Sequence, residues 1–229
     1  MGAWTRTVNT THRAIRGPPM ERCESPHAAT LPNDRGILLT ADEVLTSWGR
    51  TGKWLRMEHW DVLPDVVSIG RRFGNGFPVT CVAVREPYTE SFEKISASSS
   101  YGGNPMACAA ALASTEVIEE ENLLDHAMEL GDHCLKILNE MKQRHPIIGD
   151  VRCKGGLMGI ELVKDRETKE PFNKAGEFVY QHAFRNGLTW IPAGHILRMS
   201  PPIVMDLDTA AKGSEIIEEA IGAAEKELT

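Results

Sequence analysis

TADEV at residues 40–44 and PDVVSIGRRFGNGFP at residues 64–78 are the two stretches that decide the expected fold. Each stretch overlaps a short apolar run: residues 36–41 for the first stretch and residues 62–69 for the second. Continuous apolar runs of this length are typical of strands in a parallel sheet that is covered on both faces. A charged residue stands just beyond each run, Asp42 after the first and Arg71 after the second. Ligands of open α/β sheets bind at the carboxyl ends of strands, so these two residues mark a candidate site.

The rest of the chain alternates between strand-like and helix-like segments. Strands are expected at residues 78–84, 159–163 and 196–200, and helices at 104–121, 123–144, 175–186 and 206–228. Asn104 suits a helix N-cap and Pro105 suits the first helical position. Alternation of this kind indicates an α/β fold.

Changes in composition divide the chain into three parts. Residues 1–34 show no period and are interrupted by proline and glycine, which predicts an irregular or disordered segment. Residues 35–118 and 119–229 are expected to form two successive domains. Their boundary is expected within the helical region at residues 116–124.

Composition excludes several kinds of protein. The net charge of −7 argues against a nucleic-acid partner, because phosphate binding needs a basic face. No apolar run approaches the roughly 20 residues needed to cross a bilayer, so no membrane association is expected. His12, Cys23 and His27 lack the spacing of a metal site, and no metal is expected.

The cysteines indicate a reducing compartment. All five are scattered and none forms a Cys-x-x-Cys pair. We therefore expect a cytoplasmic protein. Four arginines within the first 22 residues keep a mitochondrial address open.

Asp42 is the first candidate for chemistry. A carboxylate at the end of a buried strand can bind the ring nitrogen of a pyridine cofactor and keep that nitrogen protonated, which strengthens the cofactor as an electron sink. Considered from periodicity alone, the more common explanation is a helix N-cap or an aspartate satisfied at the strand end.

Further motifs follow in a characteristic order. These are ADEV at 41–44, GRTG at 49–52, PDVV at 64–67, GNGFP at 74–78, YGGNP at 101–105, GDVR at 149–152, GIE at 159–161 and LRMSPP at 197–202. In order and spacing they resemble class III aminotransferases, which use pyridoxal 5′-phosphate (PLP), especially the omega-type, 4-aminobutyrate-like and alanine–glyoxylate-like members. The resemblance runs from residue 36 to the C-terminus. It implies fold type I of the PLP-dependent transferases, here the later part of the large domain followed by the small C-terminal domain.

The resemblance also implies roles in holding PLP. Asp42 matches the aspartate on the pyridine nitrogen, and Val44 matches the apolar residue on one ring face. Leu45 stands where many members have a glutamine near the phenolic oxygen. Ser100 matches the threonine that reaches the phosphate from the neighbouring subunit, and Gly102 would let the backbone approach that phosphate.

Substrate and partners are implied in the same way. Arg198 matches the arginine that binds the substrate α-carboxylate, a role that suits a planar guanidinium. Without the resemblance, a surface arginine on a strand would be the simpler explanation. The implied reaction moves an amino group from an amine or amino acid to an α-keto acid, and the implied assembly is a homodimer.

Arg71 departs from the family pattern. It occupies the position of the lysine that forms the Schiff base with PLP. Family members are also much longer, so the chain is expected to be a truncated, C-terminal portion. Two hypotheses remain open: a family enzyme whose turnover is severely reduced or absent, and a non-catalytic remnant that holds cofactor or serves in assembly.

Overall fold

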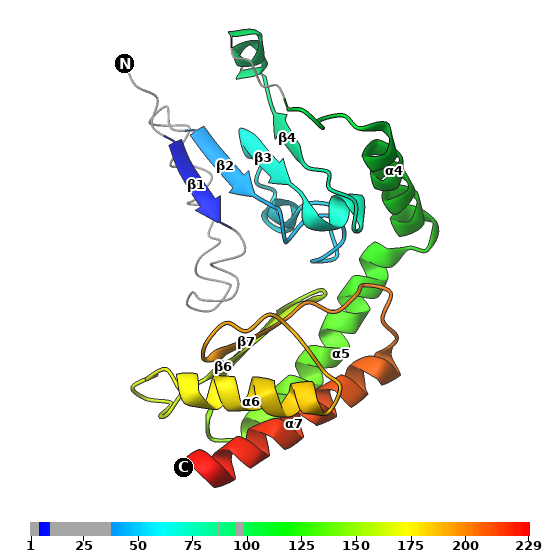
Figure 1. Ribbon diagram of the computed structural model, residues 1–229. Helices are drawn as coiled ribbons and strands as arrows, with labels where there is room; N and C mark the ends of the chain where they lie inside the picture. The colour runs from blue at the N-terminus through cyan, green and yellow to red at the C-terminus, as the bar shows by residue number, and fades with distance from the viewer. Residues whose placement is uncertain (1–4, 10–37, 87, 95–98) are drawn as a thin grey trace. The chain divides into compact units, whose positions relative to one another are not determined.

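The computed structural model describes residues 5–9, 38–86, 88–94 and 99–229 (Figure 1). Most of the segment expected to be irregular, residues 1–34, lies outside these ranges. The chain divides into two compact units, Met1–Leu124 and Asp125–Thr229. This division falls at the end of the region, residues 116–124, in which the sequence places the boundary. Each unit is described below by itself.

The N-terminal unit is built on a four-stranded sheet. Its strands run in the order β1 (Thr5–Asn9), β2 (Leu38–Asp42), β3 (Val66–Ile69) and β4 (Cys81–Val84). The first three strands are parallel and β4 is antiparallel to β3. The expected strands at residues 36–41, 62–69 and 78–84 are therefore present with narrower bounds.

β1 corrects the expectation of an irregular segment at residues 1–34. Residues 5–9 form a strand that pairs in parallel with β2, with Thr5 opposite Leu38. TRTVN contains three β-branched residues, which favour strand conformation. Its apolar pattern is too weak to reveal a strand, because the pairing depends on backbone hydrogen bonds to a partner far along the chain.

The core of this unit is small. Leu39 and Ala41 of β2 face Val67 and Ile69 of β3, and Met57 joins them. Short 3-10 helices connect β2 to β3, η1 (Arg56–Trp60), and β3 to β4, η2 (Arg71–Gly74), and a further one, η3 (Tyr88–Lys94), follows β4. η2 follows β3 after a single residue, so it lies at the carboxyl ends of the parallel strands.

Helix α4 (Pro105–Glu120) begins where the sequence predicts. The Asn104 side chain accepts hydrogen bonds from the backbone N–H groups of Met106 and Ala107, which satisfies two donors at the helix start. Further along the helix, the Ser114 hydroxyl donates to the carbonyl of Arg72 at 3.3 Å. This bond ties α4 to η2.

The C-terminal unit is an antiparallel sheet packed with three helices. The strands are β5 (Ile148–Lys154), β6 (Leu157–Leu162) and β7 (Ile196–Met199), in that order. The helices are α5 (Leu123–Arg144), α6 (Asn173–Arg185) and α7 (Leu207–Leu228). β5 was not expected as a strand, since GDVR combines a glycine and two charges and shows no clear alternation.

One continuous apolar cluster fills this unit. Its fully buried members come from every layer: Leu130, Leu138 and Met141 of α5, Ile160 and Leu162 of β6, Val179 of α6, and Ile221 of α7. The cluster is much larger than that of the N-terminal unit. Among the described residues, no helix has both the length and the apolar character needed to span a membrane.

Candidate functional site

Asp42 ends β2 with its carboxylate held in place. Its Oδ1 accepts a hydrogen bond from the Val44 N–H at 3.2 Å and another from the Ser68 hydroxyl at 3.3 Å. Ser68 is the direct neighbour of Asp42 on β3. The half-buried carboxylate is therefore oriented by both parallel strands at their carboxyl ends.

Arg71 stands at the same edge of the sheet. It begins η2, immediately after β3 and Gly70, and its side chain is exposed. Its φ of 50° lies in the left-handed region, which is uncommon for a residue with a side chain. Residues in such conformations often occur at functional sites, where the surrounding structure holds them.

The side chain of Val44 lies close to Gly70, the residue between β3 and Arg71. A Cβ added to Gly70 would lie 3.4 Å from a Val44 methyl and 3.4 Å from a Thr80 methyl. The valine side chain therefore lies beside the residue that precedes Arg71. The structure thus brings Asp42, Val44 and Arg71 together, as the sequence predicts for the ends of neighbouring strands.

The other predicted residues occupy different positions. Leu45 follows Val44 and is half-buried. Ser100 and Gly102 lie in an exposed turn that precedes α4. Arg198 is on β7 of the C-terminal unit, opposite Gly159 of β6.

Glu43 is a buried residue that sequence reasoning assigned no role. It is fully buried, and its carboxylate accepts the Met57 N–H at 3.0 Å and a hydrogen bond from the Thr46 hydroxyl. Burial raises the pKa of this carboxyl, and the Thr46 hydrogen bond opposes that change. Glu43 thereby fixes the loop that follows Asp42. The sequence offered one signal for the importance of Glu43, namely its position within the ADEV motif at residues 41–44.

Asp65 connects the two central strands from the other end. Its Oδ2 accepts the Leu39 N–H at 2.7 Å, and its Oδ1 lies 2.6 Å from an Arg85 guanidinium nitrogen. The carboxylate is almost completely buried, so this pairing is protected from solvent. It holds β2 and β3 together beneath the candidate site.

A buried arginine, Arg50, and a half-buried arginine, Arg72, lie near this edge. Arg50 is 6% exposed, and burial lowers its pKa to about 9, with the positive charge of Arg72 as a second cause. Burial likewise lowers the pKa of Arg72 to about 10. Within the described part of the chain, one terminal nitrogen of Arg72 is buried without a hydrogen-bond partner. Arg72 therefore adds a positive charge where desolvation makes it costly.

A polar row crosses the sheet of the C-terminal unit. Arg152 of β5, Gly159 of β6 and Arg198 of β7 are in register. One nitrogen of Arg152 lies 2.8 Å from Asp150 and 2.9 Å from Glu161. Sequence reasoning quoted GDVR and GIE as motifs but missed that they pair. The row places Arg198 on an ordered, polar sheet face.

Comparison with known proteins identifies the family. The model of the class III aminotransferases matches residues 25–221. This chain belongs to the class III aminotransferase family. These enzymes depend on PLP, and the expected fold type I is confirmed by the solved transaminases that this class III chain resembles.

The similar proteins carry several activities. The chain is 40% identical over 195 residues to the leucine/methionine racemase of Thermococcus litoralis, and this match covers 85% of the chain and 44% of the relative. The chain is 34% identical over 200 residues to a probable 4-aminobutyrate aminotransferase of Bacillus subtilis, and this match covers 86% of the chain and 46% of that relative. The chain thus spans less than half the length of these curated relatives.

A solved structure shows the same fold. A transaminase from the marine bacterium Virgibacillus superposes with a TM-score of 0.88 at 30% identity, covering 99% of this chain and 54% of that one. The fold is therefore that of the transaminases over nearly the whole chain.

The residues at the sheet edge fit PLP in part. An oriented carboxylate at Asp42 suits a protonated pyridine nitrogen, and the side chain of Val44 offers apolar surface beside it. Arg71 does not fit the covalent link, because a guanidinium stays charged and is not a primary amine. Asp42 and Val44 are thus compatible with binding of the pyridine ring, whereas Arg71 carries no primary amine.

Proposed function

We propose that this chain is a class III aminotransferase homologue whose family reaction transfers an amino group from an amine or amino acid to an α-keto acid. We further propose that it turns over very slowly or not at all. The observation that carries the second part is Arg71, which follows the carboxyl end of β3, the strand that pairs with Asp42 through Ser68. PLP, when bound, supplies an electron sink for the substrate α-carbon.

The proposed binding roles follow from positions in the fold. Asp42 would hold the pyridine nitrogen, Val44 would cover one ring face, and Leu45 would lie near the phenolic oxygen. Ser100 and Gly102 would reach the phosphate from a second copy of the chain, which makes a homodimer part of the proposal. Both lie in an exposed turn, which is compatible with a contact to another subunit.

Arg198 is the proposed contact for the substrate carboxylate. A guanidinium can form two parallel hydrogen bonds with a carboxylate. The ordered strand β7 and the polar row beside it support this role. The relatives' names include racemases and aminotransferases, so the donor and the acceptor are proposed only as chemical classes.

The loss of lysine accounts for the proposed loss of turnover. A lysine amine can lose its proton, attack the cofactor aldehyde and later move the substrate α-proton. The pKa of arginine is above about 12, so its guanidinium does neither at neutral pH. Arg71 retains only its charge, which can still attract the cofactor phosphate.

Covalent labelling tests this proposal. The purified chain and its Arg71→Lys variant are incubated with PLP, reduced with borohydride, and examined by intact mass and peptide mapping. We expect no specific adduct in the natural sequence and one adduct at position 71 in the variant. An adduct on one specific lysine of the natural chain, such as Lys53 or Lys154, would contradict the proposed inactivity.

A holding or assembly role is the second candidate. One observation favours it: Arg71 at the position where the family reaction needs an amine. We expect saturating PLP to raise the melting temperature of the natural chain, because a ligand that binds only the folded state stabilises it. An unchanged melting temperature would eliminate a cofactor-holding role.

For the compartment of the protein we propose the cytoplasm, with a mitochondrial address as the alternative.

A further inference from the structure

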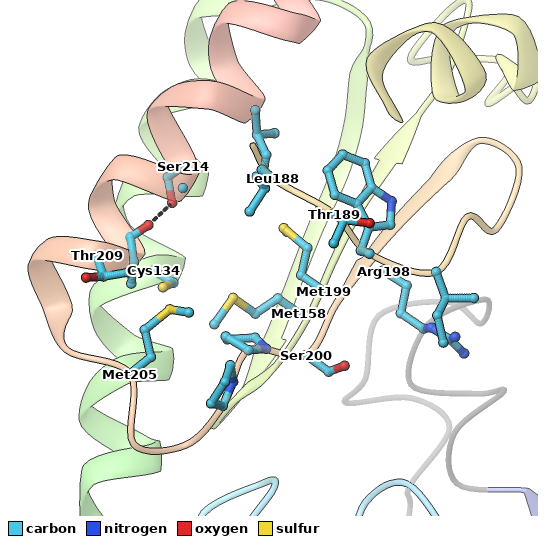
Figure 2. Close-up of a pocket in the computed structure, with 17 residues that line it drawn as sticks. Cys134, Met158, Leu188, Thr189, Arg198, Met199, Ser200, Met205, Thr209 and Ser214 are labelled. Atoms are coloured by element: carbon cyan, nitrogen blue, oxygen red, sulfur yellow. Dashed lines mark hydrogen bonds between the residues drawn. The ribbon is translucent and has the colours of Figure 1, made fainter. Parts of the chain in front are cut away.

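The C-terminal unit contains a partly open cavity of about 490 Å³ (Figure 2). Its walls come from α5, β6, β7, α7 and the loops on either side of β7. Figure 2 shows Met158, Met199, Met205 and Cys134 directed toward a common space, with Leu188 closing it from another side. Arg198 contributes to the lining, but Figure 2 shows its guanidinium directed away from this space.

This cavity is far larger than the voids of a packed protein interior, which seldom exceed a water molecule, and it is partly open to solvent. Here the cavity borders on the same apolar cluster whose other members are fully buried. Known ligand pockets measure roughly 300–1,000 Å³, and this cavity falls within that range.

Gly213 of α7 enlarges the cavity without a packing reason. At Gly131 and Gly176, an added Cβ would lie 2.5 Å and 2.0 Å from backbone oxygens, so close approach requires glycine there. At Gly213 an added Cβ would meet only a Leu188 methyl, at 3.8 Å, which is an ordinary contact. Glycine inside a helix costs about 1 kcal/mol relative to alanine. The missing side chain therefore leaves space that the fold does not need for packing.

The walls offer little to a charged molecule. The Thr209 hydroxyl already donates to Asp206 at 2.8 Å, and the Ser214 hydroxyl donates to the Ala210 carbonyl at 3.0 Å. Cys134 is buried, and burial raises the pKa of its thiol, so it stays neutral. Methionine side chains are flexible and polarizable, and they adapt to varied apolar shapes.

We propose that this cavity binds a small, uncharged ligand that is largely hydrocarbon or aromatic. The proposal rests on the cavity walls alone and is independent of PLP and of Arg71. Removal of the methionine, aliphatic and tryptophan side-chain surfaces of the cavity from water would drive binding.

Methionine methyl NMR tests the proposal with indole as the probe. The 229-residue chain is labelled with ¹³C at its methionine methyl groups and titrated with indole. We expect the signals of Met158, Met199 and Met205 to shift and saturate together. Met141, which is fully buried outside the cavity lining, and Met57 of the other unit serve as internal controls and should not move.

A matched pair of glycine variants localises the binding. Gly213→Leu places a side chain in the cavity, and we expect it to weaken indole binding at least tenfold. Gly222→Ala changes another glycine of the same helix, where an added Cβ meets only a His145 ring carbon at 3.6 Å. We expect this variant to bind indole as the natural chain does.

Three results would overturn the proposal. The first is no methyl shift up to the solubility limit of indole. The second is a set of non-saturating shifts spread over all methionines. The third is undiminished binding in a folded Gly213→Leu variant. The methionine pattern of the natural chain decides the question even where Gly213→Leu does not fold.

Discussion

At the scale of single residues, Arg71 and Arg72 are adjacent but have opposite surroundings. Arg71 is exposed at the sheet edge with a left-handed backbone. Arg72 is turned inward, where it lies near Arg50 and keeps a buried nitrogen without a hydrogen bond among the described residues. The first stands at the position proposed for the reactive lysine, and the second adds a charge that burial makes costly. Their effects should therefore separate, one on cofactor chemistry and one on stability.

Replacing Arg72 tests the cost of its charge. Burial lowers the pKa of Arg72 in the folded chain to about 10, below its ordinary value, so the folded state binds the proton less tightly than the unfolded state. The cost in stability is complete below a pH of about 10 and is relieved only as the pH rises above that value. We expect Arg72→Met to raise the free energy of unfolding by about 1 kcal/mol, measured in urea.

The control for this measurement is Lys53→Met, which removes an exposed charge from the same unit. We expect it to change the free energy of unfolding by no more than about 0.5 kcal/mol. The gain from Arg72→Met should be equal at neutral pH and at a pH near 8. A loss of stability in Arg72→Met would mean that its guanidinium forms a favourable contact.

At the scale of secondary structure elements, close backbone contacts set the spacing of the C-terminal unit. Gly131 of α5 lies against Gly155, in the turn between β5 and β6. The Cys153 thiol lies 3.3 Å from the Gly131 carbonyl and 3.3 Å from the Gly155 carbonyl. Helix and hairpin therefore approach so closely that the position of Gly131 leaves no space for a side chain.

Gly131→Ala should consequently destabilise the chain. An added Cβ would lie 2.5 Å from the Gly155 oxygen and 2.8 Å from its Cα, both of which belong to backbone. Forced separation of packed elements costs about 1–3 kcal/mol, which outweighs the gain of about 1 kcal/mol from better helix propensity. Thermal unfolding followed by circular dichroism measures the difference. Gly222→Ala is the comparison, and we expect it to be neutral or stabilising.

At the scale of the whole molecule, the two units differ in how much apolar surface they bury. The C-terminal unit has a continuous core supplied by a sheet and three helices. Among its described residues, the N-terminal unit has a core of a few residues around β2 and β3. Helix α4 also exposes Met106, Leu112 and Val117. A small core gives little stability against the entropy of the chain.

The C-terminal unit should therefore fold alone. We expect residues 123–229, which begin at the start of α5, to unfold cooperatively on heating and to keep their helical circular dichroism. Residues 1–122 expressed alone should show a weaker and less cooperative transition. A fragment 123–229 without a cooperative transition would show that its core depends on the remainder of the chain.

The sequence by itself determined the family, the order of most elements and the identity of the edge residues. Short apolar runs and cap residues act locally, so β2, β3 and α4 could be predicted from neighbouring residues. Asp42 and Arg71 could be placed at one edge because parallel strands align their carboxyl ends. The proposal that Arg71 stands in place of the Schiff-base lysine also comes from the sequence resemblance alone.

Only the tertiary structure revealed β1, the buried role of Glu43, the facing arginines Arg50 and Arg72, and the cavity beside Gly213. Each of these depends on residues that are distant in sequence and meet only after folding. A strand partner, a desolvated charge or an unfilled volume has no local pattern, because its energy is set by what packs against it.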